Sequence, residues 1–298
     1  MLSSGHHARS FATVLSLYER FGNDAIGHLA LPLYHVMHRT DQRETQETAN
    51  ERRAILAGYF ARTDQRVDIA PGFTDDSFFL TYRHDDEGEP LVSILIPTKN
   101  NAALLERCIT TLLNKTSYRN YEILVIDNQS TDPSTLAYLE TIGVSRPNLR
   151  VIKYPRPFNF SAMNNQVAGE ARGEYLLLLN DDTEIIQDTW LERMLQHARR
   201  RDVGAVGARL VYSNKTLQHA GVVLGLSDSA DHPGLGQDML VRGYMDRFQV
   251  AQNFSAVTAA CLLVAREKYF EVGGMDEDRL KVLFNDVDLC LKLGQAGY

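Results

Sequence analysis

Two adjacent carboxylates are the strongest candidates for chemistry in this sequence. Asp181 and Asp182 come with Asn180 directly after the apolar run YLLLL at residues 175–179. Carboxylates at the end of a buried strand suit Mg²⁺ or Mn²⁺, which prefer oxygen ligands and share them with the phosphates of a substrate. Asn and Asp also favour Asx-turns and helix caps. This segment alone therefore leaves both a metal site and a turn open.

Two other acidic positions could take part in a reaction. Asp127 ends the apolar run YEILVID, where its carboxylate could accept hydrogen bonds from a nucleotide base or ribose, or only shape a turn. Asp286 lies in FNDVD at residues 284–288, just before a short predicted helix. It could act as a general base towards an acceptor hydroxyl. Alternatively, Asp286 or Asp288 is an N-cap or first-turn acid that the helix dipole favours.

Alternating strands and helices would position these residues. Short apolar runs predict strands at residues 91–97, 121–126, 149–154, 175–179 and 203–212. Helical spacing predicts helices between them, one of which opens with a capping box of Thr189 and Glu192. Such a pattern indicates βαβ units and a mainly parallel sheet covered by helices on both faces. Ligands bind beyond the carboxyl ends of such strands, where residues 98–100, 127–130 and 180–182 are polar.

The first 89 residues have a different character. They predict a helix at residues 11–21, an extended segment at 26–36, a helix that ends near Arg62, and short strands between 67 and 82. A charged linker follows at residues 85–90. We therefore expect one segment at residues 1–89 and a separate α/β domain at residues 90–298.

Composition narrows the class of protein. Acidic residues outnumber basic ones by 38 to 31, giving a formal net charge of −7, which disfavours nucleic-acid binding. The three cysteines form no C-x-x-C pair, so we expect neither a disulfide framework nor structural zinc. His219 and His232 are too isolated to predict a zinc site, and we expect His219 to be structural. No apolar stretch reaches membrane-spanning length, and the start lacks a signal-peptide core. The sequence thus predicts a cytoplasmic protein, with peripheral contact at the inner face of the membrane still open.

The order of these segments resembles that of the family-2 glycosyltransferases. LVSILIPTKNN, YEILVIDNQSTD, GEYLLLLNDDTE and FNDVDLCLKLGQAGY look like the family's opening strand, nucleotide-binding turn, metal segment and catalytic segment. The resemblance implies a GT-A nucleotide-diphospho-sugar transferase fold with a small helical and extended N-terminal segment. In the family's D-x-D pattern, Asn180 takes the first position, which is a departure, and Asp182 takes the last. In the family's Glu-Asp pair, Asn285 and Asp286 occupy the two positions.

The resemblance also implies a set of site residues. Asp182 would hold Mg²⁺ or Mn²⁺, and Asp286 would be the catalytic base. The nucleotide-diphosphate sugar would be bound by Pro97, Thr98, Asn100, Asp127, Asn128, Asn165, Asn180 and Asp181.

Other stretches are similar to a bacterial subgroup that builds surface polysaccharides such as O-antigen and rhamnose-rich glycans. These are PFNFSAMNN, VGAVGARLVY, QHAGVVLG and NFSAVTAACLLV, and the resemblance runs from about Pro90 to Tyr298. The family normally continues with a further strand and a His-containing segment, so we expect a domain truncated at its C-terminus. AIGHLALPLYHVMHR resembles the closing segment of a second such domain upstream, although an unrelated helical leader would explain it equally well.

These features predict an inverting glycosyltransferase that uses a metal and a nucleotide-diphosphate sugar. Its acceptor would be a glycan or a lipid-linked hydroxyl. A truncated module that binds nucleotide sugar without turnover is one alternative. A nucleotidyltransferase is another, but it should carry a glycine-rich loop after the first strand, and residues 98–103 contain no glycine. The sequence also has no G-x-G-x-x-G after that strand, no Walker A segment and no G-x-S-x-G elbow.

Overall fold

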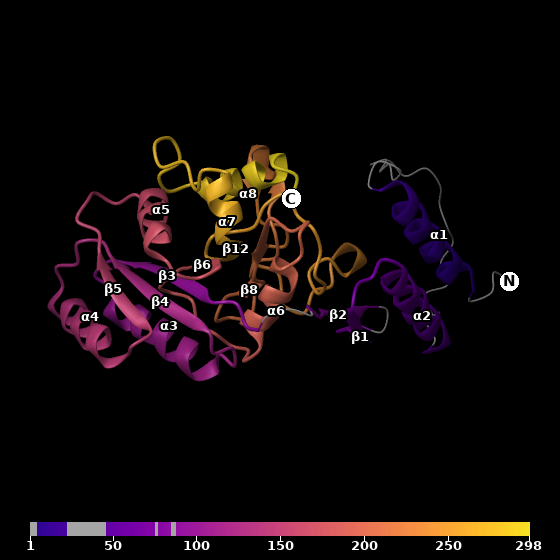
Figure 1. Ribbon diagram of the computed structural model, residues 1–298, viewed down its shortest axis with the longest axis horizontal. Helices are drawn as coiled ribbons and strands as arrows, with labels where there is room; N and C mark the ends of the chain where they lie inside the picture. The colour runs from indigo at the N-terminus through magenta and orange to yellow at the C-terminus, as the bar shows by residue number, and fades with distance from the viewer. Residues whose placement is uncertain (1–4, 23–45, 75–76, 85–87) are drawn as a thin grey trace. The chain divides into compact units, whose positions relative to one another are not determined.

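The computed structural model describes residues 5–22, 46–74, 77–84 and 88–298. The chain divides into two compact units (Figure 1). The first comprises residues 1–84 with 244–250, and the second comprises residues 85–243 with 251–298. The extended segment predicted at residues 26–36 lies outside the described residues, as does the whole stretch at residues 25–39 that resembles the closing segment of an upstream domain.

The described residues of the first unit form two α-helices, a β-hairpin and one short 3₁₀ helix. Its elements are α1 (Gly5–Phe21), α2 (Gln46–Arg62), β1 (Val67–Pro71), β2 (Phe78–Tyr82) and the short helix η3 (Tyr244–Asp246). A side chain at Gly72 would place its Cβ 2.3 Å from Ser77 Oγ, so the hairpin turn requires glycine. The Thr74 hydroxyl donates to Asp246 Oδ2 at 2.9 Å, which ties the late segment to this unit. The sequence pattern gave no sign of that connection.

A six-stranded, mostly parallel sheet forms the centre of the second unit. The strands lie in the order β5 (Leu149–Lys153), β4 (Tyr121–Asp127), β3 (Val92–Thr98), β6 (Tyr175–Leu179), β12 (Cys261–Ala265) and β7 (Ala205–Gly207). The first four are parallel, whereas β12 runs antiparallel to both of its neighbours. The predicted α/β class and mostly parallel sheet are confirmed. The carboxyl ends of four strands therefore meet at one edge, and the amino end of β12 joins them there.

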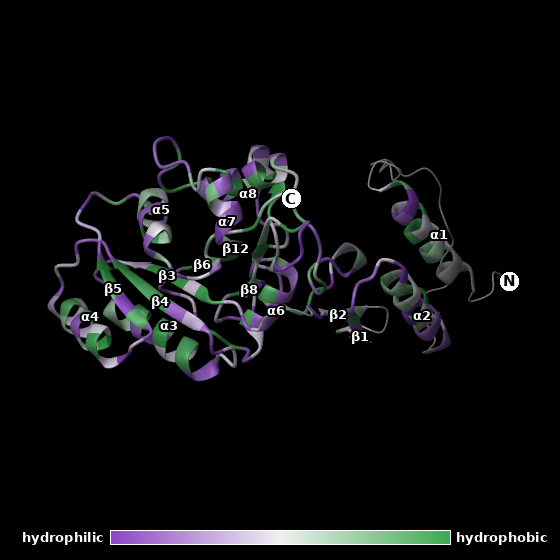
Figure 2. Cartoon of the chain, in the orientation of Figure 1, coloured by the Kyte–Doolittle hydropathy of each residue, from purple (hydrophilic) through white to green (hydrophobic). Residues whose placement is uncertain are grey.

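Helices cover both faces of this sheet. One face packs against α3 (Ala102–Lys115), α4 (Pro133–Ser145) and α6 (Trp190–Ala198), and the other against α5 (Phe160–Glu170), α7 (Arg266–Glu271) and α8 (Asn285–Gln295). In β3, Ile94 and Ile96 face the first set of helices while Leu95 faces the second. Figure 2 shows α3 and α4 with apolar and polar colours mixed along their length, as expected of helices with one buried face.

Two local predictions are wrong. Residues 203–212 do not form one strand: β7 ends at Gly207, and β8 (Leu210–Val211) pairs instead with β9 (Leu217–His219). A Cβ at Gly207 would lie 2.5 Å from Val257 Cβ, so the backbone leaves the sheet at a point of close contact. The capping box is also absent, because Thr189 makes no side-chain cap bond and Glu192 Oε1 accepts from Ser117 Oγ at 2.5 Å.

Candidate active site

A cavity of about 430 Å³ opens at the edge where the strands β3, β4 and β6 end. Seven of the residues predicted for the site line it: Pro97, Thr98, Asn128, Asn180, Asp181, Asp182 and Asp286. Asn100, Asp127 and Asn165 do not line it. A hollow of about 480 Å³ between the end of α3 and the start of α6 contains only one carboxylate, Asp188. The clustered acids therefore single out the cavity at the sheet edge as the candidate active site.

Asp181 and Asp182 contribute different properties to this cavity. Asp181 Oδ2 accepts from the Thr98 hydroxyl at 2.7 Å and from Asn101 Nδ2 at 3.5 Å, so this carboxylate is held in place from β3 and its loop. Burial raises the pKa of Asp181, and the charge of Asp182 adds to the rise while the Thr98 hydrogen bond opposes it. Asp182 is exposed and lines the cavity. A divalent cation bound between the two carboxylates would offset their mutual repulsion.

The donor set fits a divalent cation that also binds phosphate. Within the described part of the chain, no group of three or more His, Cys, Asp and Glu side chains could enclose a metal ion. Mg²⁺ and its relatives commonly use one or two protein carboxylates and take their remaining ligands from substrate phosphates and water. Asp181 and Asp182 match that pattern and do not form a closed structural metal site.

The turn after β4 offers two acceptors. Asp127 Oδ1 accepts from the Ser130 backbone N–H at 3.0 Å, so Asp127 does perform the turn role considered from the sequence. Asn128 Nδ2 donates to the carbonyls of Tyr154 and Arg156, at 3.3 and 2.8 Å. Asn128 Oδ1 is buried and accepts no hydrogen bond from any residue that the structure describes. A buried acceptor without a donor is costly, and a base or ribose bound in the cavity could supply one.

Asn100 joins two loops. It lies at a φ of +51°, a left-handed conformation that Asn tolerates. Asn100 Oδ1 accepts from the backbone N–H groups of Thr131 and Asp132, at 2.7 and 3.0 Å. The structure therefore gives Asn100 the task of fixing the loop after β3 against the loop after β4.

Asn165 lies on α5 and uses its whole amide elsewhere. Its Nδ2 donates to the Met275 carbonyl at 2.8 Å and to Glu277 Oε2 at 2.9 Å. Its Oδ1 accepts from the Tyr269 hydroxyl at 2.6 Å and from the Met275 N–H at 3.0 Å. These bonds fasten α5 to the chain after α7, and they leave Asn165 no free donor for a ligand.

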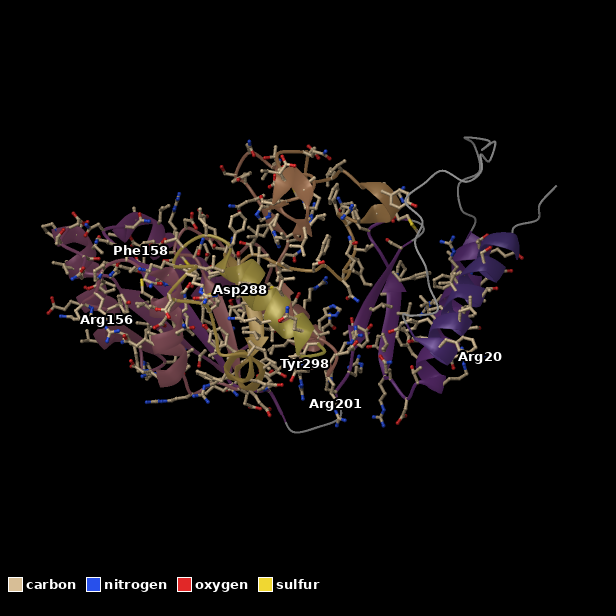
Figure 3. The ribbon with its side chains drawn as sticks, turned by 90° about the horizontal axis from the view of Figure 1, so that it is seen from above. Arg20, Arg156, Phe158, Arg201, Asp288 and Tyr298 are labelled. Carbon is tan, nitrogen blue, oxygen red and sulfur yellow. The ribbon has the colours of Figure 1, made fainter. Side chains whose placement is uncertain are left out.

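Asp286 lies in the first turn of α8 and faces the cavity. Its Oδ2 accepts from the Ala259 N–H at 3.0 Å, and its Oδ1 accepts from the Val287 N–H at 2.8 Å. The N-cap of α8 is Phe284, and Asp286 and Asp288 are both first-turn acids, which is one of the two alternatives considered from the sequence. Asp288, labelled on α8 in Figure 3, pairs with Lys292 at 3.0 Å and does not line the cavity. Of the two acids, Asp286 is therefore the one that lines the cavity.

Part of the cavity wall was not among the site residues predicted from the sequence. The missed residues are Lys99, Asn101, Phe158, Phe160, Met163, Thr258, Ala259, Ala260, Val282 and Asn285. Lys99 lies within the predicted polar cluster at residues 98–100 and Asn101 follows it, so both could have been found from that cluster. Phe158, labelled in Figure 3 in the segment before α5, carried no signal of its own. Residues 258–260 line the cavity because β12 is antiparallel to β6, which places the amino end of β12 at this edge of the sheet.

Comparison with known proteins shows the family. A 39% identical protein of Sinorhizobium fredii, "Uncharacterized protein y4gI", matches 98% of this chain and 32% of its own length. The "O-antigen biosynthesis protein RfbC" of Myxococcus xanthus is 34% identical over 92% of this chain and 21% of its own length. The chain thus spans about a third and about a fifth of these two relatives. No helix in the described ranges is long and apolar enough to cross a membrane.

Solved structures share the fold. The mannosyltransferase PcManGT from Pyrobaculum calidifontis, in complex with GDP-Man and Mn²⁺, matches 98% of this chain and 65% of its own, with a TM-score of 0.54 and 16% identity. GalNAc-T7 with UDP, GalNAc and Mn²⁺ matches 75% of this chain and 44% of its own, with a TM-score of 0.55 and 16% identity. Residues 93–267 match the family described as Glycosyl transferase family 2. That match covers more than half of the sequence, and it contains both the carboxylate pair and the turn after β4, so the chain belongs to glycosyl transferase family 2.

Proposed function

We propose that this chain transfers a sugar from a nucleotide diphosphate to an acceptor hydroxyl, with inversion at the anomeric carbon. One observation carries the proposal: the carboxylate pair of Asp181 and Asp182 and the helix-borne Asp286 line the same cavity. A glycosyl transfer of this type needs a place for a charged diphosphate and a base for the acceptor proton. The cavity holds residues suited to both.

The donor would lie with its nucleotide against the turn after β4 and its diphosphate near Asp182. We assign two acceptors to the base or ribose: Asn128, which lines the cavity, and the buried Asp127 directly before it in the chain. Pro97 and Thr98 form the wall beside them. Asp182, with Asp181 next to it, would hold Mg²⁺ or Mn²⁺, which would offset the charge on the departing diphosphate. Asn180, at the first position of the metal segment, lines the cavity and would assist donor binding.

Asp286 would act on the acceptor. The acceptor oxygen forms a bond to the anomeric carbon as the bond from that carbon to the diphosphate oxygen breaks, and the acceptor proton passes to the Asp286 carboxylate. The N–H groups of Ala259 and Val287 hold this carboxylate in place.

The acceptor that we propose is a glycan or lipid-linked sugar of a bacterial surface polysaccharide. The relative from Myxococcus xanthus, named for O-antigen biosynthesis, supports this choice. We place the reaction in the cytoplasm, at the inner face of the membrane. The three free cysteines suit a reducing compartment.

A donor screen tests this function. Thermal-shift measurements with a panel of nucleotide-diphosphate sugars, with and without Mn²⁺, should show stabilisation by at least one donor in the presence of the ion. NMR of the product formed from that donor should show the inverted anomeric configuration. A retained configuration would contradict the mechanism. Metal-dependent binding without any turnover would instead favour a module that only binds nucleotide sugar.

A further inference from the structure

The segment at residues 258–260 connects Asp286 with the chain beside the carboxylate pair of Asp181 and Asp182. The Ala259 N–H donates to Asp286 Oδ2 at 3.0 Å. The Ala260 carbonyl accepts from the Asn180 N–H at 3.1 Å, next to the carboxylate pair. All three residues of the segment line the cavity. Whatever fixes this segment therefore also fixes the carboxylate of the proposed base.

A buried histidine holds the segment from behind. His219 ends β9, and its side chain is 2% exposed. Its Nε2 accepts from the Thr258 N–H at 3.4 Å and from the Gly221 N–H at 3.3 Å. His219 does not line the cavity, so it reaches the site only through the backbone of Thr258.

A second histidine fixes the tautomer of the first. His219 Nδ1 and His232 Nδ1 lie 2.8 Å apart, and the two rings meet edge to face. Because His219 Nε2 accepts from two backbone N–H groups, its proton must sit on Nδ1 and be donated to His232 Nδ1. Burial, and then the proximity of His232, lowers the pKa of His219 to about 3. His219 thus stays neutral in this tautomer at ordinary pH.

We propose that His219 is a positioning residue for the transfer reaction: its Nε2 sets Thr258 and Ala259 so that the Ala259 N–H holds the Asp286 carboxylate. The inference rests on the proposed function, because it assigns His219 a role only if Asp286 is the base. A backbone hydrogen bond near the segment should allow the effect of His219 on catalysis to be measured without unfolding the protein. The Val222 N–H donates to the Ala256 carbonyl at 2.9 Å, two residues before the segment, so we expect the segment to stay attached when His219 is replaced.

Two substitutions at this position separate the roles of the two ring nitrogens. The side-chain oxygen of Gln lies as many bonds from Cα as Nε2 does, so His219→Gln keeps an acceptor for Thr258. The amide of Asn reaches only as far as Nδ1, so His219→Asn loses that acceptor but can still donate to His232. We expect His219→Gln to keep kcat close to that of the unchanged protein. We expect His219→Asn to lower kcat by about 10- to 100-fold, the effect of displacing a reacting group by less than about 1 Å, while the KM for the donor changes little.

Combination with a variant of the base shows whether the effect passes through Asp286. In an Asp286→Asn background, His219→Asn should cause no further loss of kcat, because the group that it positions is already disabled. If Asp286→Asn alone leaves turnover intact, the proposed function itself fails. If Asp286→Asn abolishes turnover but the Gln and Asn variants of His219 behave alike, only the inference about His219 fails.

The unchanged protein supplies a test that does not depend on whether the variants fold. In ¹⁵N NMR spectra, the His219 ring should show a protonated Nδ1 and an unprotonated Nε2. A ring protonated at Nε2 could not accept from Thr258, and this result would overturn the proposal.

Discussion

Glu122 holds the edge of the sheet opposite the cavity, and its removal should destabilise the second unit without affecting the site. It is the second residue of β4 and is 7% exposed. Oε1 accepts from the Ser93 hydroxyl and the Arg172 N–H, both at 2.7 Å, and Oε2 accepts from Arg150 Nη2 at 3.1 Å. Burial alone would raise the pKa of Glu122, but these three donors outweigh it and the pKa is lowered.

The loss of unfolding free energy in Glu122→Ala can be estimated from the hydrogen-bond donors that lose their acceptor. Glu122→Ala leaves the buried Ser93 hydroxyl and the Arg172 N–H without an acceptor, while Arg150 can still reach water. At about 1–3 kcal/mol for each unpaired group, the loss of unfolding free energy should be about 2–6 kcal/mol. Glu122→Gln keeps an oxygen for two donors but loses the charge, and should cost about 1–3 kcal/mol.

Urea unfolding followed by tryptophan fluorescence reports on the second unit of the chain, which contains Glu122. The only tryptophan, Trp190, lies on α6 and is buried against the sheet. A loss of about 2 kcal/mol should lower the urea midpoint by about 1 M, for a slope of about 2 kcal/mol per M. Glu140→Gln, at an exposed acid on α4, is the matched control and should leave the midpoint unchanged.

The pH dependence gives the same account a second test. Because the folded-state pKa is below that of the unfolded chain, the stabilisation by Glu122 is present above the unfolded pKa of about 4.3 and is lost as the pH falls through the folded pKa. The stability difference between the protein and Glu122→Gln should therefore shrink below about pH 4.3. Equal urea midpoints for the unchanged protein and Glu122→Gln at pH 7 would show that the charge of Glu122 does not contribute to stability.

Three further substitutions probe the site. Asp182→Ala should abolish the effect of Mn²⁺ on nucleotide affinity in calorimetry and leave the fold intact. The control Glu184→Ala should keep the effect of Mn²⁺. If the effect persists in Asp182→Ala, Asp182 does not hold the metal. Asp127→Ala should weaken nucleotide binding by about 1–3 kcal/mol even without metal, because a buried partner is lost; unchanged affinity would leave it a turn residue alone. Asn165→Ala should lower the thermal midpoint and spare donor affinity, because its amide binds only protein groups; the reverse pattern would support a direct role in donor binding.

The regular part of the fold follows from the sequence for a simple reason. A strand buried on both faces reads as a short apolar run, so β3, β4, β5 and β6 stand out from the helices between them. The rule that ligands bind at the carboxyl ends of parallel strands then selects residues 98–100, 127–130 and 180–182 without any structure. Residues of all three groups line or adjoin the cavity.

The other features of the fold and the site depend on contacts between residues that are distant in the sequence. The strand β12 was missed because no turn signal separates it from the segment before it. The predicted strand at residues 203–212 is broken because Gly207 passes close to Val257. His219 and His232 look isolated in the sequence, but the hairpin of β10 (Val223–Leu224) and β11 (Ala230–Asp231) brings them together. Short-range patterns cannot show such pairings.

The role proposed for Asp286, as the base of a metal-dependent glycosyl transfer, can be tested by comparing three proteins. Turnover of the nucleotide sugar is measured at saturating donor and Mn²⁺ for the protein, for Asp286→Asn and for Asp288→Asn. Asp286→Asn should bind the donor normally and lose about 10²–10⁴-fold in kcat, the usual contribution of a positioned acid or base. Asp288→Asn, which removes only the pair with Lys292, should keep turnover. Full turnover in Asp286→Asn, or a loss confined to Asp288→Asn, would contradict the account.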